Sequence, residues 1–153
     1  MTTIRYAAIK ALETKLKTIL TTNGYNYDLG ENVFIGVPKL DPKFTEYLVI
    51  WPGVDDIDDI GFYGRWLMVM PVKIEAVKEI SKEVDDIELI SQKMLSDITK
   101  CLYNPNVTGI DNSNIQYAGG GIESYPKPGE TVVGVVANYE ISYQTEAGDL
   151  TSS

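Results

Sequence analysis

Residues 132–145 read VVGVVANYEISYQT, and this stretch decides the class of fold. Every second position from Val133 onward is apolar: Val133, Val135, Ala137, Tyr139, Ile141 and Tyr143. Most of the intervening positions are small or polar. Alternation with a period of two predicts a β-strand with one buried face and one mostly wet face. The buried face needs a covering layer, which must come from elsewhere in the chain.

Two amphipathic helices are predicted to supply that layer. Apolar residues at steps of three and four over residues 4–20 predict a helix that begins near Thr3 and ends at Asn23-Gly24. A second stripe over residues 87–102 predicts another helix, which Asn104-Pro105 ends. Acidic residues lie near its start and lysines toward its end, as the helix macrodipole favours. Two such helices are enough to cover one face of a single sheet.

Four further strands are predicted, over residues 32–36, 46–51, 65–77 and 114–118. Pro71 lacks an N–H to donate, which favours an edge position or a bulge for the strand that contains it. The order α-β-β-β-α-β-β predicts an α+β fold, with a mainly antiparallel or mixed sheet and two helices packed on one face. We expect one domain over residues 1–145, followed by a flexible polar C-terminal tail over residues 146–153.

The composition is that of an ordinary globular domain. The chain has 153 residues, of which 44% are hydrophobic and 23% are charged. No apolar run reaches the ~20 residues that a membrane helix needs, and the first residues lack the apolar core of a signal peptide. We therefore expect a protein that is made and folded in the cytoplasm and has no membrane partner.

The charge is strongly negative and unevenly distributed. The formal net charge is −9, which argues against specific nucleic-acid binding. Residues 1–20 carry four basic residues and one acidic residue, a local charge of +3, so the remainder carries −12. The basic first helix, with Arg5, Lys10 and Lys17, would then attract the acidic body of a neighbouring subunit. Charge that is simply scattered and solvated is the alternative.

The residues that carry common catalytic chemistry are largely missing. The chain has no histidine, which excludes a Ser-His-Asp triad, a Cys-His pair and a histidine metal ligand. The one cysteine, Cys101, falls on the apolar stripe of the second helix, where a buried structural thiol is expected rather than a nucleophile. We predict no catalytic residues, no metal site and no cofactor.

An acidic cluster, Asp55, Asp56, Asp58 and Asp59, is the sharpest charged feature. Read as a calcium loop that begins at Asp56, it has Ile60 at the fifth position and lacks the distal glutamate. The cluster is therefore interpreted as a solvated acidic loop. It lies in a predicted loop over residues 53–65 that also contains Phe62 and Tyr63. The four aspartates, Phe62 and Tyr63 are candidate contacts with a partner protein.

Gly119, Gly120 and Gly121 form the one glycine cluster. It matches neither the phosphate loop nor the dinucleotide fingerprint, since no Gly-Lys-Ser/Thr sequence or helix opening follows. We predict a mobile hairpin loop over residues 119–131, which includes Tyr125, in preference to a ligand cradle. Trp51 and Trp66 are assigned to core or subunit contacts in preference to stacking on bases or sugars, and the ten tyrosines favour a protein-binding role.

Several segments occur in an order that resembles one known family. They are Ala11-Leu12-Glu13, residues 48–53 (LVIWPG), residues 71–76 (PVKIEA), residues 115–126 (IQYAGGGIESYP) and the closing strand followed by residues 146–149 (EAGD). The pattern spans nearly the whole chain and is similar to the tail terminator, or tail completion, proteins of long-tailed bacteriophages. These minor tail proteins carry no catalytic signature.

The resemblance implies a structural role in virion assembly. Tail terminators form a six-fold ring on the head-proximal end of the tail tube, stop its polymerisation and offer a docking face to the head connector. The implied partners are other copies of the chain in a homohexamer, the tail tube protein and the connector or neck protein, and the implied location is the virion tail. A neck protein or a tube subunit is the near alternative, and a small-molecule-binding domain is the distant one.

Overall fold

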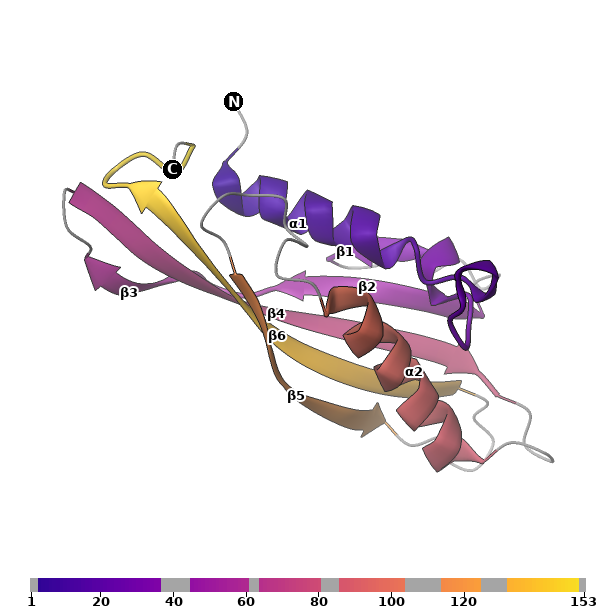
Figure 1. Ribbon diagram of the computed structural model, residues 1–153. Coiled ribbons are helices and arrows are strands. Elements are labelled where there is room, and N and C mark those ends of the chain that lie inside the picture. The colour runs from indigo at the N-terminus through magenta and orange to yellow at the C-terminus, as the bar shows by residue number, and fades with distance from the viewer. Residues whose placement is uncertain are drawn as a thin grey trace.

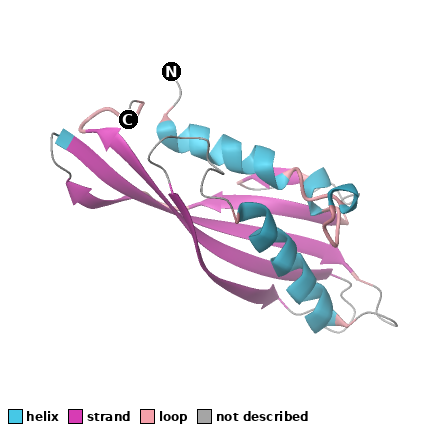
Figure 2. Ribbon diagram, viewed as in Figure 1, coloured by secondary structure: helices cyan, strands magenta, loops and turns pink. Residues whose placement is uncertain are grey.

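The computed structural model describes residues 3–36, 45–60, 64–80, 86–103, 114–124 and 132–151. Two helices lie against a mixed sheet (Figures 1 and 2). The helices are α1 (Ile4–Leu16) and α2 (Ile87–Leu102), and the strands are β1 (Val33–Ile35), β2 (Glu46–Pro52), β3 (Asp56–Ile60), β4 (Arg65–Glu79), β5 (Asn114–Ser124) and β6 (Val132–Glu146). The predicted α+β class is confirmed.

The long strands β4 and β6 form the centre of the sheet. They pair antiparallel without a break, from Arg65 opposite Glu146 to Glu79 opposite Val132. The strand order is β1-β2-β4-β6-β5, and β3 pairs with β4 as well. The β1–β2 pair is parallel and the other pairs are antiparallel, so the sheet is mixed. The beginning of β4, the end of β6 and β3 together extend beyond the helices (Figure 1).

Both helices cover the same face of the sheet. The alternation predicted for β6 is confirmed, because Val133, Val135, Ala137, Tyr139, Ile141 and Tyr143 all enter one core cluster with residues of both helices. Leu12 and Leu16 of α1 and Met94 and Ile98 of α2 are fully buried in this cluster. Each such side chain contributes roughly 1.5–3 kcal/mol of transfer free energy. The alternating apolar residues of the strands and the apolar stripes of the two helices therefore pack into one core.

Helix α1 begins where predicted but ends earlier. The side-chain oxygen of Thr3 accepts a hydrogen bond from the N–H of Tyr6 at 3.1 Å, which is an N-cap. The helix ends at Leu16 instead of Asn23-Gly24. The Thr18 hydroxyl donates to the carbonyl of Lys15 at 2.6 Å, an alternative to continued helix that threonine often takes. The chain then turns, and Ile19 is buried.

The prediction of an acidic loop at residues 55–59 is wrong for most of that segment. Residues 56–60 form β3, which pairs with residues 66–69 of β4. β4 is longer than β2, so the first residues of β4 have no pairing with β2. β3 pairs with these residues instead. Backbone pairing with this edge of β4 outweighs the low strand propensity of aspartate.

Pro71 lies in a central strand, so its predicted edge position is also wrong. On one side of β4, β2 ends opposite Val72 and β3 begins opposite Val69. The Pro71 carbonyl accepts a hydrogen bond from the Gly53 N–H at 2.7 Å between these two pairings. The N–H that proline lacks faces the same gap, where no regular ladder bond is lost.

The glycine cluster does not form the predicted loop. Gly119, Gly120 and Gly121 belong to β5, and the register with β6 shifts between Tyr117 and Gly120, which is a β-bulge. Gly119 has a φ of +106°, which favours glycine. A Cβ on Gly120 would lie 2.4 Å from the carbonyl oxygen of Val136. Residues 125–131, including Tyr125, lie outside the described residues.

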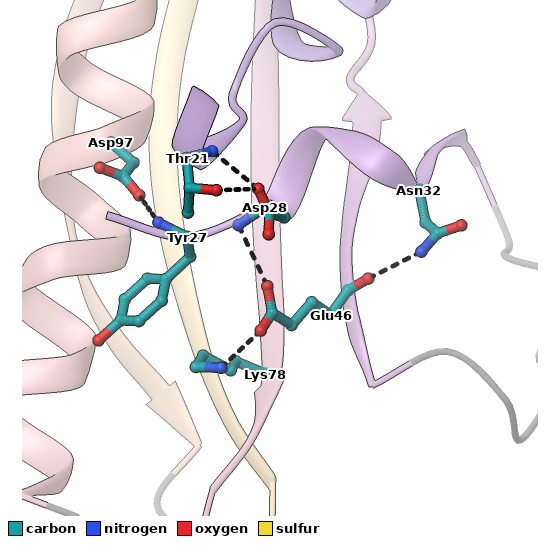
Figure 3. Close-up of polar contacts among 7 residues, drawn as sticks. All are labelled: Thr21, Tyr27, Asp28, Asn32, Glu46, Lys78 and Asp97. Atoms are coloured by element: carbon teal, nitrogen blue, oxygen red, sulfur yellow. Dashed lines mark hydrogen bonds and ion pairs between the residues drawn. The ribbon is translucent and has the colours of Figure 1, made fainter. Parts of the chain in front are cut away.

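Asp97 of α2 fastens the segment that follows α1 to the core (Figure 3). Its carboxylate accepts hydrogen bonds from the backbone N–H of Asn26 at 3.0 Å, the side-chain amide of Asn26 at 2.9 Å and the N–H of Tyr27 at 3.0 Å. Burial raises the pKa of Asp97, and the hydrogen bonds from Asn26 and Tyr27 offset part of the rise. The carboxylate thus accepts the hydrogen bonds that these N–H groups would otherwise donate to water.

Glu46, the first residue of β2, makes a second attachment (Figure 3). It accepts hydrogen bonds from Lys78 at 2.6 Å and from the N–H of Asp28 at 3.3 Å. Asp28 in turn accepts from the N–H and the hydroxyl of Thr21 at 2.7 and 2.9 Å. The amide of Asn32 donates to the Glu46 carbonyl at 3.2 Å. The segment between α1 and β1 is thereby tied to both α2 and the sheet.

Of the C-terminal segment over residues 146–153 that was predicted to be flexible, residues 146–151 are described, and Glu146 belongs to β6. The carbonyl of Leu150 accepts a hydrogen bond from the N–H of Ile4 at 2.9 Å, and the N–H of Ala147 donates to the Gly64 carbonyl at 2.6 Å. The start of α1 and the segment around Leu150 therefore lie side by side (Figure 1).

Gly120 and Gly121 offer a matched test of the β5 bulge. Gly120→Ala is expected to lower the free energy of unfolding by about 1–3 kcal/mol, because its Cβ would clash with a backbone oxygen. Gly121→Ala has open space and is expected to be neutral or slightly stabilising. Urea denaturation of both variants measures the difference, and equal stabilities would contradict the described packing of β5 on β6.

Asp97→Asn tests the buried carboxylate. We expect a loss of about 1–3 kcal/mol at neutral pH, because one carboxylate oxygen that accepts a backbone N–H is replaced by an amide donor. The raised pKa means that the folded state binds a proton more tightly than the unfolded chain does. The stability that comes from this tighter proton binding is complete at pH values below the ordinary aspartate pKa of 3.8. It is lost as the pH rises through the pKa of the folded state.

The stability advantage of the wild type over Asp97→Asn is therefore expected to shrink as the pH rises above 3.8. Urea denaturation of both proteins across this range measures it, and groups common to the two proteins cancel in the difference. An advantage that grows with pH would mean that the pKa of Asp97 is lowered in the folded protein.

Candidate interaction surface

Two predicted contact residues, Arg5 and Asp55, meet within the chain. The Arg5 guanidinium forms an ion pair with the Asp55 carboxylate and donates to the Gly53 carbonyl at 2.7 Å. The Tyr143 hydroxyl donates to the other Asp55 oxygen at 2.6 Å. Burial and the neighbouring Asp55 carboxylate raise the pKa of Tyr143, so its hydroxyl stays protonated. This cluster joins the start of α1, the β2–β3 connection and β6.

Lys10 and Lys17 also have an acidic neighbour in the same chain. Both donate to one oxygen of Glu13, at 2.9 and 3.3 Å. Partial burial alone would raise the pKa of Glu13, but the two lysines hold it below its ordinary value. Arg5 is paired with Asp55, whereas Lys10 and Lys17 share the one negative charge of Glu13. The predicted role of these three residues in attracting a neighbouring subunit stays a prediction.

The remaining predicted contacts are spread over different places. Asp56 is exposed on β3. Asp58 and Asp59 belong to the same strand by their backbone. Phe62, Tyr63 and Tyr125 lie outside the described residues. Gly119, Gly120 and Gly121 lie on β5 at the other side of the sheet, so the structure does not bring the acidic and glycine clusters together.

One face of the sheet has no helix over it in the described part of the chain (Figure 2). The register places Phe34, Val49, Glu75 and Val136 in one row across β1, β2, β4 and β6, opposite in parity to the core residues. The rings of Phe34 and Tyr47 lie 6.2 Å apart, edge to face. We call this side of the sheet the open face. Val49 and Val136 are buried within this face, whereas the partly exposed aromatic residues Phe34 and Tyr47 are of the kind that protein contacts favour.

A shallow hollow of about 210 Å³ lies on the open face. It is lined mainly by Trp51, Pro71, Lys73, Asn138 and Glu140. The indole Nε1 of Trp51 is buried and has no hydrogen-bond acceptor among the described residues, although buried tryptophan usually finds one. The hollow combines an aromatic ring with a cation, a carboxylate and an amide, which suits a side chain of a partner protein better than an enclosed substrate.

The sequence predicted a strand over residues 114–118 and gave Gly119, Gly120 and Gly121 as candidate contacts, but it did not indicate that β5 is an edge strand. Residues 114–122 contain no charged side chain, in a chain with a net charge of −9. Edge strands usually carry lysine, proline or inward charges that prevent pairing with another chain. This absence of charge was visible in the sequence, but the glycines led to a loop assignment.

The described residues form no metal site, and their one thiol is buried. No group of Cys, Asp and Glu side chains in these ranges is arranged to hold a metal ion. Cys101 is buried, as predicted, its thiol contacts the Lys15 carbonyl at 3.2 Å, and burial raises its pKa. None of the described helices has the length and apolar character that crossing a membrane requires.

Comparison with models of known protein families gives no match, and comparison with curated proteins gives no significant match. The site must therefore be interpreted from its own geometry and chemistry.

Arg5 and Lys10 provide a matched test of the polar contacts of α1, since each substitution to glutamine removes one positive charge. Arg5→Gln is expected to cost about 1–3 kcal/mol of stability, because it leaves the partly buried Asp55 without its cation. Lys10→Gln leaves Glu13 paired with Lys17, so it is expected to change stability much less. Thermal unfolding compares the two, and equal effects would contradict a structural role for the Arg5–Asp55 pair.

Proposed function

We propose that this chain is a non-catalytic assembly subunit of a long-tailed bacteriophage, and specifically its tail terminator. In this role a ring of copies caps the head-proximal end of the tail tube, stops tube polymerisation and provides the docking surface for the head connector. The partners are other copies of the chain, the tail tube protein and the connector or neck protein. The location is the virion tail.

The observation that carries the proposal is the one-sided packing of the sheet. Both helices bury one face, whereas the open face and the β5 edge retain groups suited to contacts with other proteins. A subunit in a ring needs two unlike surfaces, because a closed ring uses head-to-tail contacts. The open face and the β5 edge are two different surfaces through which a copy can meet its neighbours in the ring, the tube or the connector. The order of segments that resembles tail terminators supports the specific role.

The fold is also compatible with a tail-tube subunit, which is the main alternative. The sequence suggested few strands, which argued against a tube protein, but the sheet has six strands and two of them have 15 residues. Strand content therefore no longer separates the two roles. Their assembly behaviour does, because a tube subunit polymerises into filaments and a terminator stops at a ring.

The proposal predicts a specific defect when the gene is deleted in the parent phage. Electron microscopy is expected to find tails of uncontrolled length that do not join heads, and a plasmid copy of the gene should restore normal virions. Tails of normal length that merely lack heads would favour a neck protein. Long filaments formed by the purified protein would favour a tube subunit.

A further inference from the structure

The hydrogen bond between Gly53 and Pro71 fixes which way the backbone groups of β4 point. In a β-strand, the N–H and C=O of one residue point to the same side, and successive residues alternate. The Pro71 carbonyl points toward β2 and β3, because it accepts from Gly53. The backbone groups of Val72 therefore point toward β6, and so do those of every second residue of β4.

The unbroken β4–β6 register carries this direction across the sheet. Tyr139 lies opposite Val72, so its backbone groups point toward β4. The groups of Glu140 then point toward β5 and pair with Gln116, which lies opposite. It follows that Ile115 and Tyr117, on either side of Gln116, direct their N–H and C=O groups away from the sheet.

These outward groups form a free edge. In the described part of the chain, no backbone hydrogen bond reaches Ile115 or Tyr117 from outside the sheet. The Tyr117 side chain is 49% exposed. The other edges differ, because β1 has only three residues and β3 is acidic. β5 is thus the longest edge strand in the described part of the chain, and its residues 114–122 lack the usual charged protection.

We propose that the β5 edge binds an extended strand of a second copy of this chain, through the backbone groups of Ile115 and Tyr117. The charge of the chain favours this occupant. Copies with a net charge of −9 repel one another, and the uncharged stretch over residues 114–122 is where they approach with the least repulsion. A strongly basic partner would instead be drawn to the acidic surfaces, such as exposed Asp56 on β3.

The bulge limits the strength of this pairing. The register with β6 is regular only over residues 114–117 before it shifts at Tyr117/Gly120, so the flat edge offers two outward residues. A contact of this size associates weakly in solution and becomes stable when several copies close a ring. The inference rests on the proposed assembly role and names the surface through which one copy meets the next.

Amide hydrogen exchange, followed by NMR on the full chain, tests the pairing directly. The chain is measured at micromolar and at millimolar concentration, with sedimentation equilibrium run alongside. The amides of Ile115 and Tyr117 are expected to exchange rapidly in the dilute protein and at least about tenfold more slowly in the associated form. The Gln116 amide, which faces β6, is the internal control and should be protected in both samples.

Charge variants separate the edge from the rest of the surface. Gln116→Glu places a negative charge on the exposed side of β5 and is expected to weaken association at least about tenfold. Gln92→Glu adds the same charge on an exposed position of α2 and should change association less than about twofold. Circular dichroism and urea denaturation verify that both variants fold.

The pairing would be overturned by any of three results: a chain that stays monomeric at millimolar concentration, edge amides that remain fast in the associated form, or equal effects of the two charge variants. These outcomes do not decide the proposed function. A deletion phage with unregulated tails would still establish a terminator that uses another interface. Normal tails after deletion would remove the terminator role even if the edge pairs.

Discussion

The unbroken pairing of β4 with β6 is the constraint on which the rest of the structure depends. Two 15-residue strands in one register determine which side chains face the helices and which face away. A slip of one residue would turn Met70, Ile74 and their neighbours out of the core. The same register directs the free groups of β5 outward, and the length of β4 beyond β2 provides the place for β3 and the gap that tolerates Pro71. Core, open face and edge are consequences of one ladder.

Local patterns were sufficient for the elements that carry the core. The stripe of α2, the alternation of β6 and the cap at Thr3 each depend on residues within one element, so the sequence predicted them. The failures were nonlocal. β3 is a strand because β4 has a free edge, not because aspartate favours one, and the glycines of β5 serve a bulge whose partner, Val136, lies in another strand.

The contact residues were harder to predict for the same reason. Arg5 and Asp55 are 50 positions apart, and only the fold brings them together with Tyr143. Charges that suggested a patch for a neighbouring copy turn out to hold the start of α1 against β6. The buried position of Cys101 was predictable, since it follows from the apolar stripe of its own helix. The β5 edge required the sheet order, which no single segment contains.

We propose that this chain acts through the surfaces that the one-sided packing of the sheet leaves without a helix. A cryo-electron microscopy reconstruction of the head–tail junction of the parent phage tests it most directly. The account predicts a closed ring of this chain between the last tube ring and the connector, with each β5 edge against the neighbouring copy. A junction that lacks the chain, or that holds it with β5 facing solvent and the open face uncovered, would contradict it.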